Sequence, residues 1–208
     1  MAGYTFFTHP MSRGQVARWA LHEVAADYHQ VLVEWQAKPP ELLAANPMGK
    51  LPTIIHHAPE GDRVVTEAAA ICHYLAEIHP GAGLLPSDRE KADYFRWLFF
   101  AAGPVESAIT ARALQCEPTP EQQVMAGWGS LERTVRTLAG HFADHDYVCG
   151  PRFTMADVYV GSAVDFGMNF GSLPPEPPLV AYAERYRERP AFRAAKAIDN
   201  ALIAEKRT

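Results

Sequence analysis

Two polar side chains stand where the sequence predicts that a helix begins. Ser12 comes just before residues 14–23, in which apolar residues recur at helical spacing, and Glu67 opens a second such segment, residues 67–78. The free N–H groups of a helix N-terminus carry partial positive charge, which favours hydroxyl and carboxylate side chains there. Each residue is therefore either an ordinary helix cap or a polar group of a binding site.

Cysteine usage and charge exclude several other kinds of chemistry. Cys72, Cys116 and Cys149 lie far apart without a CxxC pair, and the nine histidines show no metal-ligand spacing, so we expect no metal. The balance of 19 Lys and Arg against 24 Asp and Glu gives a net charge of −5, which argues against a nucleic-acid partner. The most apolar run, residues 97–105, is too short to span a membrane, and residues 1–11 lack the basic region of a secretory signal. We expect a cytoplasmic protein.

The first 80 residues alternate between strand and helix patterns. The chain has 208 residues, of which 48% are hydrophobic, enough for one domain or two small ones. Strands are predicted at residues 4–8, 28–34, 51–55 and 64–65, and helices at 14–23 and 67–78. This order, βαβ followed by ββα, predicts a thioredoxin-like domain over residues 1–80.

Strand patterns stop in the second half of the chain. After a linker at residues 81–88, residues 89–208 read as an all-helical domain, so the fold class is α/β plus all-α. A helix is predicted over residues 90–103, which Pro104 should kink or end. Further helix starts are predicted at Thr119, which precedes Pro120, and at Thr154, whose capping box includes Asp157. The last two helices are expected at residues 179–188 and 191–204.

Four segments resemble landmarks of the cytosolic glutathione transferases of bacterial type, and they occur in the family's order. The segments are N-P-M-G-K-L-P-T at residues 46–53, T-E-A-A-A-I at 66–71, F-T-M-A-D at 153–157 and R-P-A-F at 189–192. The resemblance implies an enzyme with glutathione as cosubstrate. It also implies a homodimer that acts in detoxification on a small hydrophobic electrophile.

The resemblance assigns glutathione-binding roles to several residues of the first domain. Pro52 would be cis, and the backbone of Leu51 would pair with the cysteinyl part of glutathione like an added strand. Glu67 would receive the γ-glutamyl ammonium group, and the helix N-terminus at Ala68 would hold the adjacent carboxylate. The family usually has Ser where this chain has Ala68, a loss of one hydrogen bond of about 0.5–1.5 kcal/mol. Lys38 and Lys50 are rival candidates for the glycyl carboxylate.

The family's thiol activator lies just after the first strand. Here that loop contains neither Cys nor Tyr, so the resemblance points to Ser12 as a hydrogen-bond donor to the sulfur, with Arg13 adding positive potential. A free thiol has a pKa of about 8.5, and a hydroxyl together with a helix N-terminus can lower it by about two units. The alternative interpretation, that Ser12 only caps the helix, stays open.

The second domain would supply the pocket for the hydrophobic cosubstrate. The candidate lining residues all lie on its first helix: Tyr94, Trp97, Leu98 and Ala101. Two alternatives to conjugation remain open, namely glutathione-dependent reduction of a peroxide or disulfide, and binding without catalysis. The sequence does not identify the electrophile.

Overall fold

The structure is a computed structural model in which residues 3–206 are described. The chain forms two compact units. The first contains the described residues up to Leu85 together with those from Arg189 onward, and the second contains residues 86–188. In the described part of the chain, no helix is both long and apolar enough to cross a membrane.

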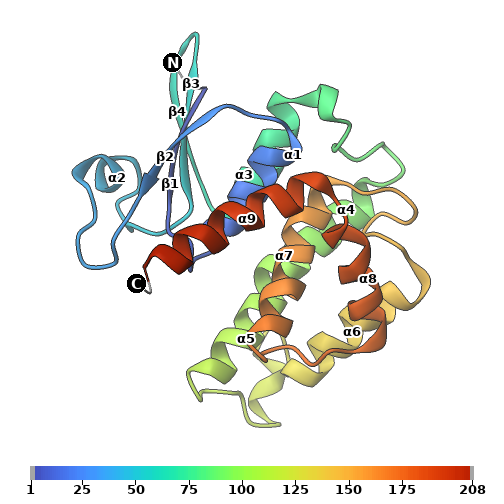
Figure 1. The fold of residues 1–208 in the computed structure, drawn as a ribbon. Helices are drawn as coiled ribbons and strands as arrows, with labels where there is room; N and C mark the ends of the chain where they lie inside the picture. The colour runs from blue at the N-terminus through green and yellow to red at the C-terminus, as the bar shows by residue number, and fades with distance from the viewer. Residues whose placement is uncertain (1–2, 207–208) are drawn as a thin grey trace. The chain divides into compact units, whose positions relative to one another are not determined.

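A four-stranded mixed sheet forms the centre of the first unit (Figure 1). Its strands are β1 (Tyr4–Thr8), β2 (Tyr28–Leu32), β3 (Thr53–Ala58) and β4 (Gly61–Thr66), in the order β2-β1-β3-β4. β1 runs parallel to β2 and antiparallel to β3, and β3 pairs antiparallel with β4. This is the thioredoxin-like arrangement expected from the alternating first 80 residues.

Helices cover both faces of this sheet. Side chains alternate between faces along a strand, so Phe6 and Phe7 of β1 point in opposite directions. The guanidinium of Arg18 in α1 (Gly14–Glu23) lies 5.3 Å from the Phe6 ring centroid, which places α1 on that face, where it packs with α3 (Ala68–Ile78). On the other face, Leu42 of α2 (Pro40–Ala45) packs with Phe7. The sequence patterns did not predict α2.

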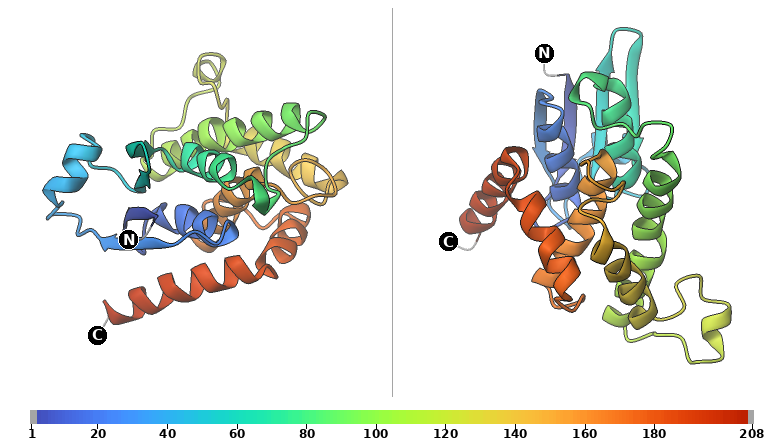
Figure 2. Two further views of the ribbon diagram at one scale, coloured as in Figure 1. Left: turned by 90° about the horizontal axis from the view of Figure 1, so that it is seen from above. Right: turned by 90° about the vertical axis from the view of Figure 1, so that its right-hand side faces the viewer.

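The last helix, α9 (Pro190–Glu205), belongs to the first unit and lies against α1 (Figures 1 and 2). Trp19 and Phe192 pack edge to face with ring centroids 4.9 Å apart. Buried Arg18 donates from Nε to Asp199 Oδ1 at 3.0 Å. The sequence analysis assigned residues 89–208 to one domain, whereas the structure groups this helix with the sheet, because its polar and apolar partners lie on α1.

The second unit consists of helices. They are α4 (Lys91–Phe100), a π-helical turn at Ala101–Val105, α5 (Glu106–Ala113), α6 (Leu131–Asp144), α7 (Met155–Asn169) and α8 (Pro177–Arg187). The Phe142 ring of α6 stacks on the Tyr182 ring of α8 with centroids 3.7 Å apart. The predicted capping box at the start of α7 is present, with buried Asp157 accepting the Thr154 N–H at 2.8 Å.

Pro104, which was expected to kink or end the helix, lies within the π-helical turn that interrupts the α-helix between α4 and α5. Another prediction for this unit needs correction. The expected helix start at Thr119 yields only a 3-10 turn at Gln122–Val124, although the local cap forms. Val124 and Met125 are each 91% exposed, so this segment has no buried apolar face to stabilise a longer helix. It extends outward from the helical unit in both views of Figure 2.

Candidate functional site

The register of the sheet brings three loops of the first unit to one edge. Phe7 near the end of β1 pairs with Thr53 at the start of β3, and Thr53 pairs with Thr66 at the end of β4. The loop after β1, the loop before β3 and the start of α3 therefore lie side by side. These loops hold Ser12, Leu51 and Glu67, so the structure places the three predicted site residues at the same edge.

Ser12 lies in the loop that leads into α1, one residue before the helix N-cap, Arg13. Its side chain is 9% exposed. Ser12 Oγ donates to the His9 carbonyl at 2.7 Å and accepts the Gly14 N–H at 2.9 Å. The hydroxyl thus acts in the turn as a cap does, and it can donate to a ligand only by giving up its bond to His9. Arg13 is exposed at the start of the helix.

His9 organises this loop, a role that the sequence did not indicate. Its Nδ1 accepts the Met11 N–H at 3.1 Å, and its ring lies against Trp35 with centroids 4.4 Å apart. Lys206 Nζ lies 3.2 Å from His9 Nε2 and donates to Glu34 at 2.5 Å. Burial and the Lys206 ammonium lower the pKa of His9. The His9 ring is therefore neutral and buried. Its contacts fix the position of the His9 backbone carbonyl, which accepts the hydrogen bond from the Ser12 hydroxyl.

Asn46 shapes the loop before β3. Its Nδ2 donates to the Lys50 carbonyl at 3.2 Å and to Thr53 Oγ1 at 3.1 Å, and its Oδ1 accepts the Met48 N–H at 3.2 Å. The Leu51–Pro52 peptide bond is cis, as the resemblance implied.

The backbone of Leu51 is open to a ligand. Its side chain packs against the cluster of Phe7, Val33 and Leu42. Among the residues that the structure describes, neither the N–H nor the C=O of Leu51 has a hydrogen-bond partner. An unpaired N–H and C=O beside a sheet can pair with an extended peptide.

Glu67 has an unusual backbone for a residue with a side chain. Its φ is 62° and its ψ 114°, a sparsely populated conformation that glycine accepts more readily. The side chain is exposed and makes no capping hydrogen bond to α3. Glu67 therefore stands at the N-cap position of α3 without a capping hydrogen bond, which leaves both a favourable interaction with the helix dipole and a binding role open. The first N–H groups of α3, starting at buried Ala68, remain available to an anion.

Lys38 and Lys50 place two ammonium groups near these loops. A Cβ built on Gly49, whose φ is +58°, would lie 2.9 Å from Lys38 Cδ and 3.1 Å from its Nζ. Lys38 therefore extends across the loop that carries Lys50, and Gly49 provides the space. Within residues 3–206, neither ammonium group has a carboxylate partner. The pair suits a ligand carboxylate.

The described residues include three free cysteines, Cys72, Cys116 and Cys149, of which Cys116 is exposed. No three His, Cys, Asp or Glu side chains among the described residues are grouped to hold a metal ion. The three cysteines are free thiols, and burial raises the pKa of Cys72 and, to about 12, that of Cys149. A raised pKa keeps both groups protonated and unreactive near neutral pH.

The four residues predicted for a hydrophobic pocket are interior residues in this structure. Tyr94, Trp97, Leu98 and Ala101 are 0–3% exposed, and the exposed aromatic side chains of α4 are Phe95 and Phe99. Helical periodicity marks a buried face, but it does not distinguish a core from a pocket. The four residues thus offer little surface to a second substrate as the chain stands.

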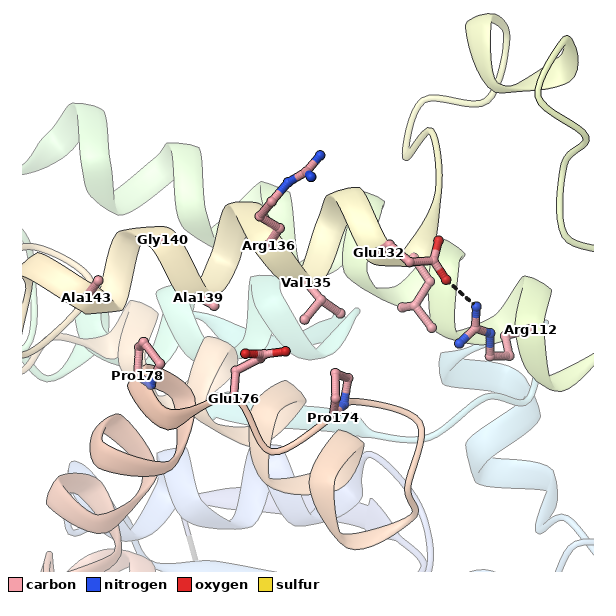
Figure 3. Close-up of a pocket in the computed structure, with 11 residues that line it drawn as sticks. Arg112, Glu132, Val135, Arg136, Ala139, Gly140, Ala143, Pro174, Glu176 and Pro178 are labelled. Atoms are coloured by element: carbon pink, nitrogen blue, oxygen red, sulfur yellow. Dashed lines mark hydrogen bonds and ion pairs between the residues drawn. The ribbon is translucent and has the colours of Figure 1, made fainter.

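A cavity of about 520 Å³ does occur within the helical unit, but at another place (Figure 3). One wall is α6, including Val135 and Ala139, and the other is the loop from Pro174 to Pro178. The ion pair between Arg112 and Glu132, at 2.7 Å, lies at one end. None of the four predicted residues lines this cavity, and sequence spacing gave no signal for it.

A thioredoxin-like sheet unit, a helical unit and an open backbone beside a cis-proline together indicate the class of protein. Two family models match the chain: the glutathione S-transferase N-terminal domain at residues 2–77 and the C-terminal domain at residues 108–166. The chain therefore belongs to the cytosolic glutathione transferase family.

Curated relatives agree with this assignment at low identity. Glutathione S-transferase GstA of Escherichia coli O157:H7 is 27% identical over 195 residues, covering 89% of this chain and 90% of that protein. Glutathione S-transferase Z2 of Arabidopsis thaliana is 28% identical over 163 residues, covering 72% of this chain and 69% of its own.

Solved structures share the whole fold. A glutathione transferase from Methylococcus capsulatus has a TM-score of 0.77 and 24% identity, covering 95% of this chain and 99% of its own. A sphingomonad glutathione S-transferase in complex with glutathione has a TM-score of 0.75 and 25% identity, covering 94% of this chain and 98% of its own. The fold therefore extends over nearly the complete chain.

Proposed function

We propose that this protein is a glutathione transferase that binds glutathione at the sheet edge of its first unit. It activates the glutathione thiol for attack on a hydrophobic electrophile and serves in detoxification. The observation that carries the proposal is the unpaired backbone of Leu51, which lies between the Ser12 loop and the start of α3. The named relatives and the glutathione-bound neighbour support the same ligand.

Each part of glutathione has a chemical counterpart at this edge. The cysteinyl backbone pairs with the N–H and C=O of Leu51, next to Pro52. The γ-glutamyl ammonium group binds the Glu67 carboxylate, and its α-carboxylate accepts hydrogen bonds from the first N–H groups of α3 at Ala68. Lys38 or Lys50 binds the glycyl carboxylate. The strained backbone of Glu67 fits a binding role, since strain tends to persist at functional sites.

The chemistry requires that the bound thiol lose its proton more easily than in water. At pH 7 only about 3% of a free thiol is ionised. Ser12 donates its hydroxyl proton to the sulfur after leaving the His9 carbonyl, and the N-terminus of α1 and Arg13 add positive potential. The thiolate then uses a lone pair to form a carbon–sulfur bond, while the electrophile loses a leaving group with its bonding pair or, where the thiolate adds to an activated double bond, takes up a proton at the other end of that bond. For the hydrophobic electrophile, the sequence proposed Tyr94, Trp97, Leu98 and Ala101, which lie in the interior of the helical unit in this structure.

The hydrogen bonds of Ser12 also support a second candidate function. Because its hydroxyl already donates to His9 and accepts from Gly14, the site can bind glutathione without ionising it. The protein would then be a glutathione-binding carrier, or a reductase of peroxides or disulfides that needs a further reactant.

We further propose a cytoplasmic homodimer. Phe95 and Phe99 are 37% and 65% exposed on α4, and their stacked rings have centroids 6.4 Å apart. An exposed aromatic pair is a favourable contact for a second copy, and two-fold dimers are the commonest closed assembly. The three free thiols agree with a reducing compartment.

The deciding experiment is a glutathione titration of the purified protein, followed at the ultraviolet absorbance of the thiolate near neutral pH. We expect saturable binding with a growing thiolate signal. We expect Ser12→Ala to abolish that signal and lower kcat at least 10-fold, while it changes the Kd of glutathione less than threefold. Ser172→Ala, which also removes a hydroxyl donor to a backbone carbonyl, is the control and should behave as wild type.

The other outcomes separate the candidates. Binding without a thiolate signal in the wild type favours the carrier or reductase. Equal losses of binding and turnover in Ser12→Ala would make Ser12 a structural cap. No binding at millimolar glutathione would contradict the proposal.

A further inference from the structure

Thr8 carries a buried hydroxyl group that has no hydrogen-bond partner among residues 3–206. Thr8 is the last residue of β1 and is fully buried. Its carbonyl accepts the Val33 N–H at 2.9 Å, so only the side chain is left unpaired in this part of the chain. Leaving a buried hydroxyl unpaired is costly, and valine would fill the same space without that cost. The hydroxyl therefore calls for an explanation.

Gly14 shows which group lies next to this hydroxyl. A Cβ built on Gly14 would be 2.1 Å from Thr8 Oγ1 and 2.9 Å from Ser12 Oγ. Both hydroxyl oxygens thus lie close to the same point beside the first residue of α1. The backbone of Gly14 has no positive φ, so space rather than conformation accounts for glycine here. Any other residue would put a side chain where the Thr8 hydroxyl lies.

We infer that Thr8 is a positioning residue that acts through Ser12 on the bound thiol. The inference rests on the proposed function of the site. In the free protein the Ser12 proton goes to the His9 carbonyl, and its Oγ accepts only the Gly14 N–H. Ser12 Oγ has two lone pairs and the Gly14 N–H uses one of them, so one is open to a second donor whichever way the Ser12 proton points. The Thr8 hydroxyl is unpaired among the described residues of the free protein, and it turns to this lone pair when the Ser12 proton turns to the sulfur.

The consequence is a chain of hydrogen bonds from Thr8 to Ser12 to sulfur. A hydroxyl that accepts two hydrogen bonds becomes a stronger donor, because each bond polarises the next. The thiolate is then stabilised more than the thiol, and the pKa of bound glutathione falls further than Ser12 alone achieves. No proton leaves Thr8 or Ser12 in this arrangement, since both only donate hydrogen bonds.

The test compares Thr8→Val with Thr8→Ser in the full chain. The pKa of bound glutathione is read from thiolate absorbance against pH, and the Kd is measured by calorimetry. We expect Thr8→Val to raise that pKa by about 0.5–1, which is about 3- to 10-fold less thiolate below the pKa, with the Kd changed less than threefold. Thr8→Ser should keep the wild-type pKa. Thermal unfolding should show a Tm for Thr8→Val at or above that of wild type, since an unpaired polar atom is removed.

Three results would overturn the inference: an unchanged thiol pKa in Thr8→Val, a Thr8→Ser variant as impaired as Thr8→Val, or a lowered Tm. The double variant Ser12→Ala with Thr8→Val adds a further check. The pKa of bound glutathione should be no higher in the double variant than in Ser12→Ala alone. Additive increases of this pKa would show that Thr8 does not act through Ser12. If wild type binds no glutathione, the proposed function fails; if it binds and ionises glutathione while Thr8→Val changes nothing, only the role of Thr8 fails.

Discussion

At the scale of single residues, the site depends on groups whose bonding is left incomplete by the fold. The backbone of Leu51 has no partner in the described chain, and the Glu67 carboxylate makes no capping bond. Polar groups of a folded protein are normally paired, so groups left open at one edge mark a place prepared for a ligand. Ser12 is the contrasting case, since its hydroxyl already has two partners and must exchange one of them.

Two substitutions of Glu67 can separate its effect on stability from its effect on glutathione binding. Glu67→Ala and Glu67→Gly both remove the carboxylate, so both should weaken glutathione binding at least 10-fold in calorimetry, because a hydrogen bond to a charged group is lost. Only glycine also relieves the positive φ. We therefore expect the free energy of unfolding, measured in urea titrations, to be about 1 kcal/mol higher for Glu67→Gly than for Glu67→Ala. Equal stability of the two variants would show that the backbone is not strained, and unchanged affinity would remove Glu67 from the binding site.

At the scale of elements, helix ends are fixed by long-range ionic contacts as much as by local caps. In the first unit, Glu23 at the end of α1 binds Arg189 just before α9, with both hydrogen bonds at 2.7 Å. In the helical unit, Glu90 stands at the N-cap of α4 and accepts the Ser87 N–H at 2.7 Å. Glu90 also binds Arg152, 62 residues away, at 3.1 Å and 2.5 Å. One carboxylate at the start of α4 thus joins the turn before the helix to a distant loop.

This ion pair should give the helical unit an acid-sensitive contribution to stability. The Arg152 hydrogen bonds, together with the Ser87 N–H, lower the pKa of Glu90 to about 2. Because the folded pKa lies below that of an unfolded glutamate, the contribution is present above about pH 4.5 and is lost as the pH falls toward 2. We expect Glu90→Gln to cost about 1–2 kcal/mol of unfolding free energy at pH 7, since partial exposure of Arg152 screens the pair.

The measurement is urea unfolding of wild type and Glu90→Gln between pH 2.5 and 7. The difference in the free energy of unfolding between wild type and Glu90→Gln should shrink steadily below pH 4.5. Glu41→Gln, which alters an exposed carboxylate on α2, serves as the control and should shift stability by only a few tenths of a kcal/mol. A difference that stays constant across this pH range would show that the charge of Glu90 is not responsible.

At the scale of the whole molecule, the chain is divided into two units that do not follow the order of the sequence. Residues from Arg189 onward return to the unit that contains β1, so the sheet unit is built from both ends of the chain. Ser12 and its neighbours are supported from the C-terminal end as well, because Lys206 contacts both His9 and Glu34. The edge proposed to bind glutathione is therefore not the product of the first 80 residues alone.

The exposed face of α4 predicts self-association. We expect wild type to have twice the 23.0 kDa chain mass in light scattering at micromolar concentration, and Phe99→Glu to have the mass of one chain. A buried charge at a two-fold contact would meet its own copy, which strongly disfavours the dimer. Phe170→Glu is the matched control, since Phe170 is 70% exposed at the end of α7 and should leave the mass unchanged. A wild-type monomer, or equal effects of both substitutions, would contradict this interface.

Much of the fold could be predicted from the sequence because it is encoded locally. The strand at Tyr4–Thr8, the helix at Gly14–Glu23 and the capping box of Thr154 and Asp157 each depend on side chains within a few positions of one another. The site motifs could also be recognised by their resemblance to the family, because the loop at residues 46–53 and the helix start at Glu67 are each a contiguous segment of sequence. Composition and periodicity together were sufficient to order a thioredoxin-like unit before a helical one.

Only the tertiary structure decided which of these pieces meet. The pairing of Phe7, Thr53 and Thr66 places three loops at one edge, and the ion pair of Arg18 with Asp199 assigns the last helix to the sheet unit. Only the tertiary structure likewise shows that the four predicted pocket residues near α4 are buried and that the Thr8 hydroxyl is unpaired among the described residues. Arg18 and Asp199 are 181 residues apart, and contacts of this kind are set by the packing of whole elements and leave no periodic trace in the sequence.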